Sequence, residues 1–414
     1  MTTTPSAASD GAIYPSEGSG PAEGSGKISN ADATASVMKA IFGAGCFALP
    51  WAFANGGVAL TTASMLFTCL LSLKTLTWLF RARNIALALD KTIDASKVQN
   101  YVDIADVTLG RGGGTLTRFT MCFTAFGVAS AYLVFIASTL ATITQGLSSL
   151  PAALQSDKML VYAVSPIMVL LAFLRDFSVL SSISILGNLS VLVGMAFVLV
   201  DATKSPAGLA SLPMSAPKQF SAYVGSVAFL FLVHFALPDI ESNMQDKDKF
   251  VPSAIVGFSL CAMIALIFGV VGAVGYGPDV KSVAIAMLKG GAVAVTVKLL
   301  LCANVLATFP LIVRSSFTTV ENALGGMSVA SSNVMRTAYV FLAAFCGASI
   351  PSFGKLVGLV GGVACTFLSL TLPVFMLYNM SRKSTEHALS WGEKVVMAFI
   401  LLISFAIMVS VTIA

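Results

Sequence analysis

Two glycines separated by one residue interrupt the first long apolar stretch of the chain. Residues 41–50 read Ile-Phe-Gly-Ala-Gly-Cys-Phe-Ala-Leu-Pro, which places Gly43 and Gly45 in the middle of that stretch. Glycine weakens a helix, and backbone groups freed in hydrocarbon need partners, so such a break persists where it is buried or lines a cavity. The N–H groups of residues 43–45 can hold a carboxylate, and the carbonyls of Ile41 and Phe42 can accept an ammonium group. The pattern therefore predicts a site for a small zwitterion.

A second interruption is expected near the end of the apolar segment 220–237. The chain reads Phe-Leu-Val-His-Phe-Ala-Leu-Pro from position 231, so His234 stands four residues before Pro238. Proline cannot donate a backbone hydrogen bond, and the carbonyls freed between Leu232 and Phe235 would accept the ammonium group. Glycine and proline also occur in membrane helices that merely pack together, which explains a single such element equally well. Two interruptions at matching positions favour the binding site.

Four side chains in the apolar segments are candidates for coupling to an ion. His234 titrates near physiological pH and is the candidate proton relay, and the alternative is a structural hydrogen bond to a neighbouring helix. Lys298 would place a fixed ammonium where a cation could bind, or would snorkel to the outer interface. Asn304 and Thr308, deeper in the same segment, would ligate sodium through oxygen or would hydrogen-bond another helix.

The composition is that of an integral membrane protein. Of 414 residues, 57% are apolar and only 10% are charged, which is far from the averages of soluble domains. All seven cysteines fall in apolar segments, and the sequence shows no metal-type Cys/His spacing, nucleotide-binding motif or nucleophile-and-base arrangement. We therefore expect no enzyme activity, no catalytic residue, no metal, no other cofactor and no nucleic-acid partner. The lipid bilayer is the expected surrounding.

Eleven segments are apolar and about long enough to span a membrane. They cover residues 33–53, 58–80, 115–147, 159–174, 179–200, 220–237, 253–274, 291–317, 334–350, 353–378 and 391–413. The first five (about 33–200) and the next five (about 220–378) have similar total lengths and are divided by a long polar connection. Five spans per half give the halves opposite topology, which is typical of inverted-repeat transporters whose first helix in each repeat is broken. The segment 391–413 would be an accessory helix.

The basic residues predict the orientation of the chain. Lys and Arg concentrate in alternate connections, above all between the second and third segments, and such connections stay in the cytosol. This places the N-terminus in the cytosol. Residues 1–30, rich in Ser, Thr, Gly and Ala, are a predicted disordered cytosolic tail without a signal-peptide pattern, ahead of a membrane domain 31–414. The mixed-charge residues 239–249 are expected to form a solvated turn with exposed ion pairs.

These motifs resemble the amino acid/auxin permease family, a group of amino acid transporters within the amino acid/polyamine/organocation superfamily. The resemblance rests first on the stretch from Asn30-Ala-Asp-Ala-Thr-Ala-Ser through Gly43-Ala-Gly-Cys-Phe-Ala-Leu-Pro to Asn55-Gly-Gly. Residues 127–136 are similar to the family's third helix. Residues 234–244 are similar to its His-x-x-x-Pro pattern, with Val233 where many members have glycine.

The resemblance implies a secondary active transporter of neutral amino acids that works by alternating access and is ion-coupled, with the proton favoured over sodium. The membrane would be the plasma membrane or a vacuolar or lysosomal one. The alternative from another class is an amino acid sensor that uses the same fold without net transport. Family position gives Phe126, Tyr132 and Phe235 as pocket walls or gates around the substrate side chain. The expected substrate-binding residues are Ile41, Gly43, Ala44, Gly45, Cys46, Phe126, Tyr132, Leu232, His234 and Phe235, and the expected ion-coupling residues are His234, Lys298, Asn304 and Thr308.

Overall fold

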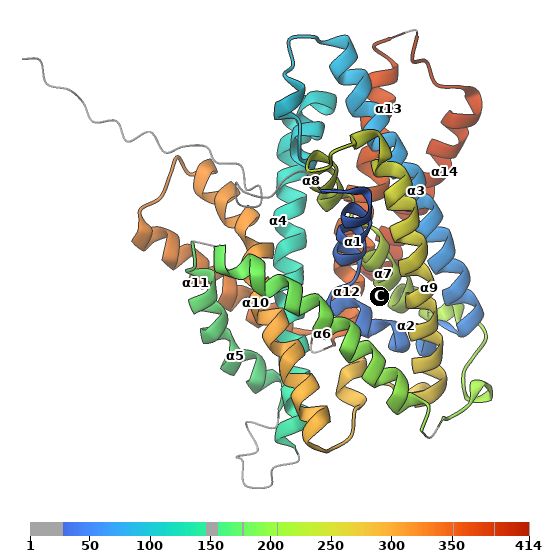
Figure 1. Ribbon diagram of the computed structural model, residues 1–414, viewed down its shortest axis with the longest axis vertical. Helices are drawn as coiled ribbons and strands as arrows, with labels where there is room; N and C mark the ends of the chain where they lie inside the picture. The colour runs from blue at the N-terminus through green and yellow to red at the C-terminus, as the bar shows by residue number, and fades with distance from the viewer. Residues whose placement is uncertain are drawn as a thin grey trace, which may run out of the picture.

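The computed structural model describes residues 28–145, 156–175, 178–204, 206–350, 352–384 and 386–413, without the side chains of 178–188 and 219–222. The described residues are helical apart from their connections and one isolated β-bridge, as the sequence predicts (Figure 1). The helices are α1 (Asn30–Ile41), α2 (Leu49–Gly56), α3 (Val58–Leu89), α4 (Tyr101–Thr144), α5 (Asp157–Ala172), α6 (Ser178–Ala202), α7 (Phe220–Phe231), α8 (Leu237–Ser242), α9 (Phe250–Tyr276), α10 (Ala292–Ala323), α11 (Val329–Ser349), α12 (Phe353–Leu359), α13 (Leu372–Ser381) and α14 (Trp391–Ile413).

The described part of the chain contains eight helices that are long and apolar enough to cross a membrane. The bent pair formed by residues 30–41 and 44–56 makes a ninth such span. Two of the predicted spans correspond to shorter apolar helices, because α5 has 16 residues and the apolar part of α6 with described side chains is Leu189–Ala202. The chain is therefore a multi-pass membrane protein, and the count of eleven spans stays a prediction.

Both predicted interruptions are present in the structure. After α1, Phe42 and Gly43 are extended, and a short 3₁₀ helix, η1 (Ala44–Ala48), leads into α2. The stretch 44–56 is bent by 49° relative to α1. After α7, Leu232 and Val233 leave the helix, and a second 3₁₀ helix, η6 (His234–Ala236), leads into α8. The first and sixth spans are thus each made of two half-helices joined by non-helical backbone.

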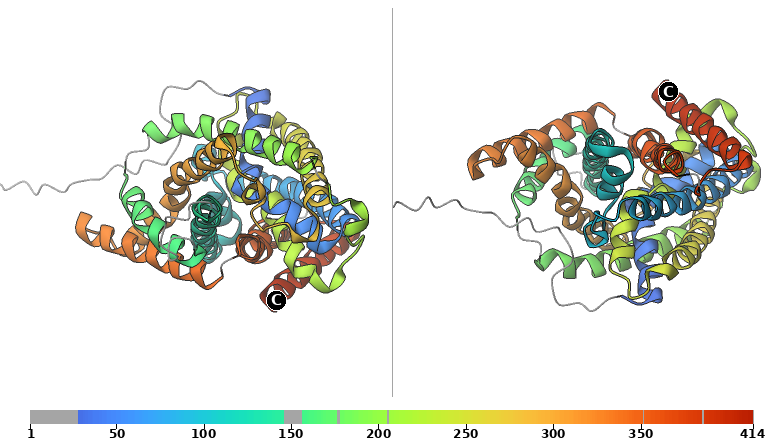
Figure 2. Two further views of the ribbon diagram at one scale, coloured as in Figure 1. Left: turned by 90° about the horizontal axis from the view of Figure 1, so that it is seen from below. Right: turned by 90° about the horizontal axis from the view of Figure 1, so that it is seen from above.

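The helices form two groups with one span between them. In the first group, α1, α2 and α3 pack against α7, α8 and α9. In the second, α4, α5, α6, α10 and α11 pack against one another. The tenth span, 353–381, contacts α7 and α3 on one side and α4 on the other, as Figure 2 shows from both ends. This arrangement places the two breaks inside the molecule, in the first group.

Glycines bring α7 and the tenth span into backbone contact. A Cβ atom built on Gly225 of α7 would lie 2.2 Å from the carbonyl oxygen of Gly358, and one built on Gly361 would lie 2.2 Å from the carbonyl oxygen of Gly225. Beside this contact the tenth span is π-helical over Val360–Cys365 and Phe367–Thr371. A π-helical turn is uncommon and often marks a functional region. Only glycine permits this approach, which sets the position of the half-helix α7.

The start of α4 differs from the sequence-based boundary at residue 115. The helix begins at Tyr101, where the Asn100 side chain and the Asp103 carboxylate cap each other's backbone N–H groups. Gly110, with a φ of 76°, then kinks it. Residues 101–110 are too polar to be recognised as a span, yet the reciprocal caps favour a helix there. The left-handed kink needs glycine.

The expectation of a solvated turn at residues 239–249 is wrong for Glu241. This residue lies in α8 and is 3% exposed. Its carboxylate accepts two hydrogen bonds of 2.8 Å from the guanidinium of Arg83 in α3. The pair of Lys249 and Asp246 is exposed as expected, with 3.4 Å between Nζ and Oδ2. Hydropathy alone could not reveal Glu241's partner, because Arg83 lies in a distant part of the chain.

The first residues that the structure describes are attached to the chain just after α8. The Ile28 N–H donates to the Asn243 carbonyl at 2.9 Å, and the Gln245 N–H donates to the Ile28 carbonyl at 3.1 Å. Ser29 then caps α1 together with Asp32. Of the predicted tail 1–30, residues 1–27 lie outside the described residues, and the last three are ordered by these contacts.

Candidate functional site

The break in the first span exposes three consecutive backbone donors. The Phe42 N–H bonds to the Met38 carbonyl at 2.8 Å, and the Cys46 N–H bonds to the Gly43 carbonyl at 3.2 Å. Between them, the N–H groups of residues 43–45 donate no hydrogen bond to another described residue, and the Ile41 and Phe42 carbonyls accept none. The donors stand at the N-terminal end of the continuous helical stretch 44–56, where the helix dipole is positive. This arrangement suits a carboxylate.

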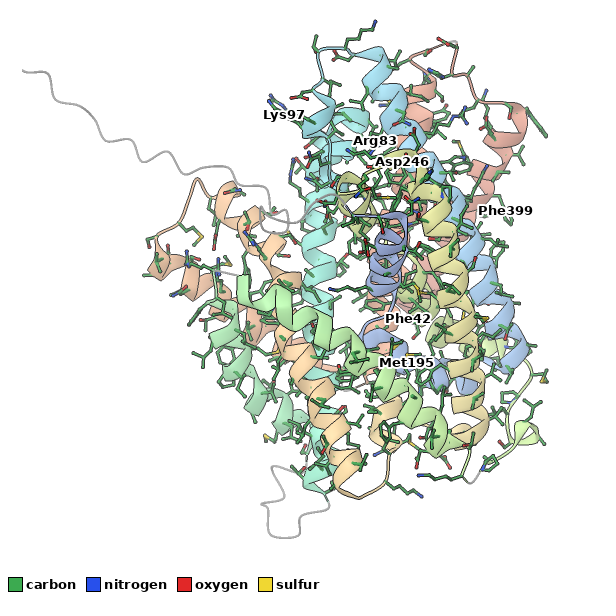
Figure 3. The ribbon with its side chains drawn as sticks, viewed as in Figure 1. Phe42, Arg83, Lys97, Met195, Asp246 and Phe399 are labelled. Carbon is green, nitrogen blue, oxygen red and sulfur yellow. The ribbon has the colours of Figure 1, made fainter. Side chains whose placement is uncertain are left out.

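Open space adjoins this backbone on one side. A Cβ atom built on Gly43 meets no other atom within 4 Å, whereas one built on Gly45 would lie 2.5 Å from Cε1 of Phe229 in α7. Gly43 and Gly45 are half-buried, while Phe42, Ala44 and Cys46 are buried. Phe42 lies at mid-height in the molecule (Figure 3). A small ligand can therefore approach the main chain at Gly43, with the Phe229 ring lying over Gly45.

The break in the sixth span is held by side chains from two other spans. The Phe231 carbonyl accepts a hydrogen bond of 2.8 Å from the Ser72 hydroxyl of α3, and the His234 N–H donates to the Ser369 hydroxyl of the tenth span at 3.4 Å. The Val233 carbonyl is used by the Ala236 N–H. Of the carbonyls expected to receive an ammonium group, that of Leu232 accepts no hydrogen bond from a described residue. It is the acceptor best suited to a ligand.

His234 is buried against α3. Its Nε2 atom lies 3.0 Å from the Thr75 hydroxyl oxygen and 3.1 Å from the Ser72 carbonyl oxygen. Because a carbonyl only accepts hydrogen bonds, Nε2 carries the hydrogen, and a neutral ring then has its lone pair on Nδ1. Nδ1 is buried without a hydrogen-bond partner among the described residues. The contact of Nε2 with α3 matches the alternative predicted from the sequence, a structural hydrogen bond to a neighbouring helix. Nδ1 is the atom that a proton relay would use.

The candidate ion-coupling residues of α10 lie in two separate places. Lys298 is 3% exposed, and its Nζ donates to the Leu288 carbonyl at 2.8 Å and to the Thr142 hydroxyl at 2.9 Å. It thus reaches toward the loop before α10, as a snorkelling lysine would, but ends inside the protein. Ten residues of helix, about 15 Å, separate it from Thr308. Its ammonium is occupied by these partners.

Thr308 lies beside the Tyr132 side chain. The Tyr132 side chain of α4 lies near that of Thr308, and the Thr308 hydroxyl donates to the Asn304 carbonyl at 3.0 Å. Tyr132, Asn304 and Thr308 are all half-buried. The structure therefore brings one predicted wall residue together with two predicted ion-coupling residues, between α4 and α10.

Phe126 and Phe235 are placed differently from each other. The Phe126 ring packs edge-on against Tyr339 of α11, with 5.3 Å between ring centroids, so its partner belongs to the second helix group. Phe235 is half-buried within η6, beside the second break. Cys46 is fully buried, with its sulfur 3.8 Å from that of Met195 in α6. Its side chain is therefore packed against α6, and its backbone N–H contributes to the break by bonding to the Gly43 carbonyl.

Four residues that the sequence reading did not single out complete the two breaks: Phe229, Ser72, Thr75 and Ser369. Ser72 and Thr75 stand three residues apart on one face of α3. Two hydroxyl residues so spaced in an apolar segment are a signal that could have been found. Phe229 and Ser369 reach the breaks only through tertiary packing.

Two cavities described in the structure lie away from the breaks. One of about 400 Å³ lies between α3, α9 and the connection that carries His387. The other, of about 200 Å³, lies among residues of α5, α10 and α11. Neither is lined by a residue of 41–48 or 231–237.

Membrane spans that are broken into two half-helices are typical of a class of secondary transporters. Comparisons with known proteins agree with that class. The family described as transmembrane amino acid transporter protein matches residues 26–414, and the chain belongs to this family. Its relatives include the amino acid transporter AVT3C of Arabidopsis thaliana, 26% identical over 378 residues, covering 87% of this chain and 84% of the relative. Vacuolar amino acid transporter 3 of Saccharomyces cerevisiae is 27% identical over 372 residues, covering 86% of this chain and 52% of that longer protein.

Solved structures share the fold at low sequence identity. The inward-facing conformation of Mhp1 has a TM-score of 0.56 at 12% identity, covering 89% of this chain and 79% of that one. MhsT in complex with L-phenylalanine has a TM-score of 0.51 at 13% identity, covering 93% of this chain and 100% of that one. The sequence-based family assignment and the all-α transporter fold with two broken helices are confirmed.

Proposed function

We propose that this protein is a proton-coupled secondary transporter of neutral amino acids. The observation that carries the proposal is the set of three consecutive N–H groups at residues 43–45 that donate to no other described residue, next to open space at Gly43 and packed against the second broken span. The donors would hold the α-carboxylate. The free carbonyls of Ile41, Phe42 and Leu232 would accept the ammonium group.

Neutral substrates follow from the charge of the two breaks. Residues 41–48 and 231–236 carry no Asp, Glu, Lys or Arg. An amino acid whose own side chain is charged would bring an uncompensated charge to the middle of the membrane, which is costly. Apolar and small polar side chains would instead contact Phe229 and Phe235.

Proton coupling rests on His234. Within residues 41–48 and 231–236 it is the side chain of the type that, when free, titrates near neutral pH, and its Nδ1 has no hydrogen-bond partner among the described residues. Protonation there would add a charge beside the substrate-binding carbonyls and would be compensated by a bound carboxylate. Asn304 and Thr308 with Tyr132 are the competing site, which would take sodium through oxygen ligands.

Alternating access would use the two helix groups. The first, with α1, α2, α3, α7, α8 and α9, would rock against the second. The 5+5 inverted repeat (33–200 and 220–378) would supply the symmetry, and α14 would remain accessory. Vacuolar transporters among the relatives support a vacuolar membrane. The N-terminus would lie in the cytosol, as the distribution of basic residues predicts.

Uptake into proteoliposomes tests the proposal. Radiolabelled neutral, acidic and basic amino acids would be compared under an imposed pH gradient, with and without sodium. We expect neutral amino acids to accumulate with the pH gradient alone. Accumulation that requires sodium at fixed pH would contradict proton coupling. Saturable binding without any flux would favour the amino acid sensor.

A further inference from the structure

The cavity of about 200 Å³ at the edge of the second helix group is lined by three arginines. They are Arg175, just after α5, Arg314 in α10 and Arg336 in α11. These three helices lie together at one side of the molecule (Figure 2). The cavity shares no residue with the two breaks, and the proposed transport mechanism does not use it.

Arg175 and Arg336 are held by hydrogen bonds to neutral groups, and Arg336 also by a carboxylate. Arg336 is 7% exposed and donates to the Ala172 carbonyl at 2.8 Å and to Oε1 of Glu321 at 2.9 and 3.1 Å. Its guanidinium also lies 4.9 Å from the ring centroid of Phe317. Arg175 donates to the Ser332 hydroxyl at 3.2 Å and to the Asn333 side-chain oxygen at 3.3 Å. The guanidinium groups are therefore held in place around the space.

The cavity region carries excess positive charge. Among the described residues, Glu321 is the carboxylate that contacts Arg336, and its Oε1 also accepts a hydrogen bond of 2.5 Å from Ser332. Asp176 follows Arg175 in the sequence and lies outside the described residues, and with it counted the sum remains positive. Like charges gathered in a region of low dielectric repel one another, so an anion would be stabilised there. The planar guanidinium matches phosphate oxygens especially well.

The mouth of the cavity is amphipathic. Leu174, Arg175, Arg314 and Thr318 line the cavity and are exposed, and Leu311, three residues before Arg314 in α10, is exposed as well; each leucine is 37% exposed. A free phosphate ion would use only the polar groups. A ligand that also covers leucines on the outer surface of a membrane protein needs hydrocarbon chains.

We propose that this cavity binds the phosphate headgroup of an anionic phospholipid, with its acyl chains lying over Leu174 and Leu311. The end of α5, the end of α10 and the start of α11 lie on the side that the proposed orientation makes cytosolic. Anionic lipids, including phosphoinositides, concentrate in that leaflet, and basic pockets between helices there are suited to their headgroups.

Lipid retention by the full-length protein tests the proposal. The protein would be reconstituted in phosphatidylcholine nanodiscs with increasing shares of phosphatidylinositol 4-phosphate, and retained lipid would be measured by native mass spectrometry. We expect the double variant Arg175→Gln/Arg314→Gln to bind the lipid at least tenfold more weakly, which is about 1.4 kcal/mol. Arg175→Lys/Arg314→Lys keeps the charge but not the planar fork, so it should lose less and provides a second variant if the first fails to fold.

The control double variant is Lys97→Gln/Lys383→Gln, which removes the same charge from exposed connections. It should retain the lipid like the unmodified protein. Equal weakening in both double variants would overturn the proposal in favour of general surface electrostatics. Full competition by inorganic phosphate at the concentration of the headgroup would also overturn it, because the site would then take a free anion. Failure of the unmodified protein to retain the lipid would do the same, without bearing on amino acid uptake.

Discussion

Gly43 and Gly45 look equivalent in the sequence but have different surroundings in the structure. A side chain at Gly43 would enter empty space beside the free N–H groups, whereas one at Gly45 would displace the Phe229 ring. A Gly45 variant could therefore lose uptake either because the ligand site is lost or because packing against α7 is disturbed, and the two effects could not be told apart. Gly43, at a φ of −132°, adopts a backbone conformation open to any residue. It is the position at which the proposed carboxylate cradle can be tested without disturbing the fold.

We expect Gly43→Ala to insert into membranes and unfold at a temperature close to that of the unmodified protein, while amino acid uptake falls at least tenfold. The added methyl group would occupy the space in which the carboxylate approaches the backbone. Uptake and thermal unfolding of the purified protein would be measured side by side. Gly290→Ala is the matched control, because a Cβ there also meets nothing within 4 Å. Normal uptake by Gly43→Ala would refute the cradle.

His234 allows coupling to be separated from binding. We expect His234→Gln to lose pH-driven accumulation while keeping exchange of labelled for unlabelled amino acid across proteoliposomes. The glutamine amide can still donate to the Ser72 carbonyl, so the break would stay intact, but it cannot take up a proton at neutral pH. His387→Gln, at the other of the two histidines, is the control and should transport normally. Accumulation that persists in His234→Gln would make the histidine purely structural.

The sequence predicted the two breaks but not the residues that hydrogen-bond to them or pack against them. Gly43, Gly45 and Pro238 are local signals, because glycine and proline change the backbone wherever they stand. The Ser72 hydroxyl that satisfies the Phe231 carbonyl lies 159 positions away in the chain. The burial of Cys46 toward Met195 was equally invisible, since it depends on how α6 crosses the first span.

Among the helices, the half-helix α8 is anchored to α3 by a buried ion pair. The side chains of Arg83 and Glu241 are 13% and 4% exposed, and the carboxylate is held by both guanidinium nitrogens. Such a pair is a weak source of net stability, but removing one partner leaves an uncompensated buried charge. The pair therefore fixes where α8 sits on α3.

We expect Arg83→Met to destabilise the protein by about 3–5 kcal/mol, and Arg83→Met/Glu241→Met to recover most of that loss. The single variant leaves the Glu241 carboxylate buried without its counter-ion, whereas the double variant replaces the pair with apolar side chains. Thermal unfolding in detergent would report both. Lys249→Met, which removes a partner from the exposed pair with Asp246, should change stability little. A double variant as unstable as the single one would show that the pair contributes more than neutralisation.

Element boundaries were predictable where apolar residues decide them and not where caps or ion pairs do. The polar start of α4 and the extension of α8 to Ser242 depend on Asn100 with Asp103 and on Glu241 with Arg83. Neither interaction alters hydropathy. The π-helical stretches of the tenth span are likewise absent from any periodic pattern of its residues, although they accompany the glycine contact with α7.

At the scale of the whole molecule, the connections lie at two opposite ends. Lys97, between α3 and α4, is at the end that also carries α8 (Figure 3), and the connection between α9 and α10 is at the other end (Figure 1). The distribution of basic residues assigns the first end to the cytosol. The proposed lipid site and the attachment of Ile28 near the end of α8 both lie on the side thus assigned to the cytosol. The lipid proposal therefore depends on this orientation.

We expect cysteines introduced as Lys97→Cys and Lys289→Cys to react from opposite sides of the membrane. Both lysines are exposed, while the native cysteines of the chain are buried or half-buried within helices. In intact vacuoles, whose outer face is cytosolic, a membrane-impermeant thiol reagent should label Lys97→Cys and should spare Lys289→Cys until the membrane is opened with detergent. The unmodified protein measures background labelling. The reverse pattern would invert the orientation, and labelling of both before detergent would mean that the two ends are not separated by the membrane.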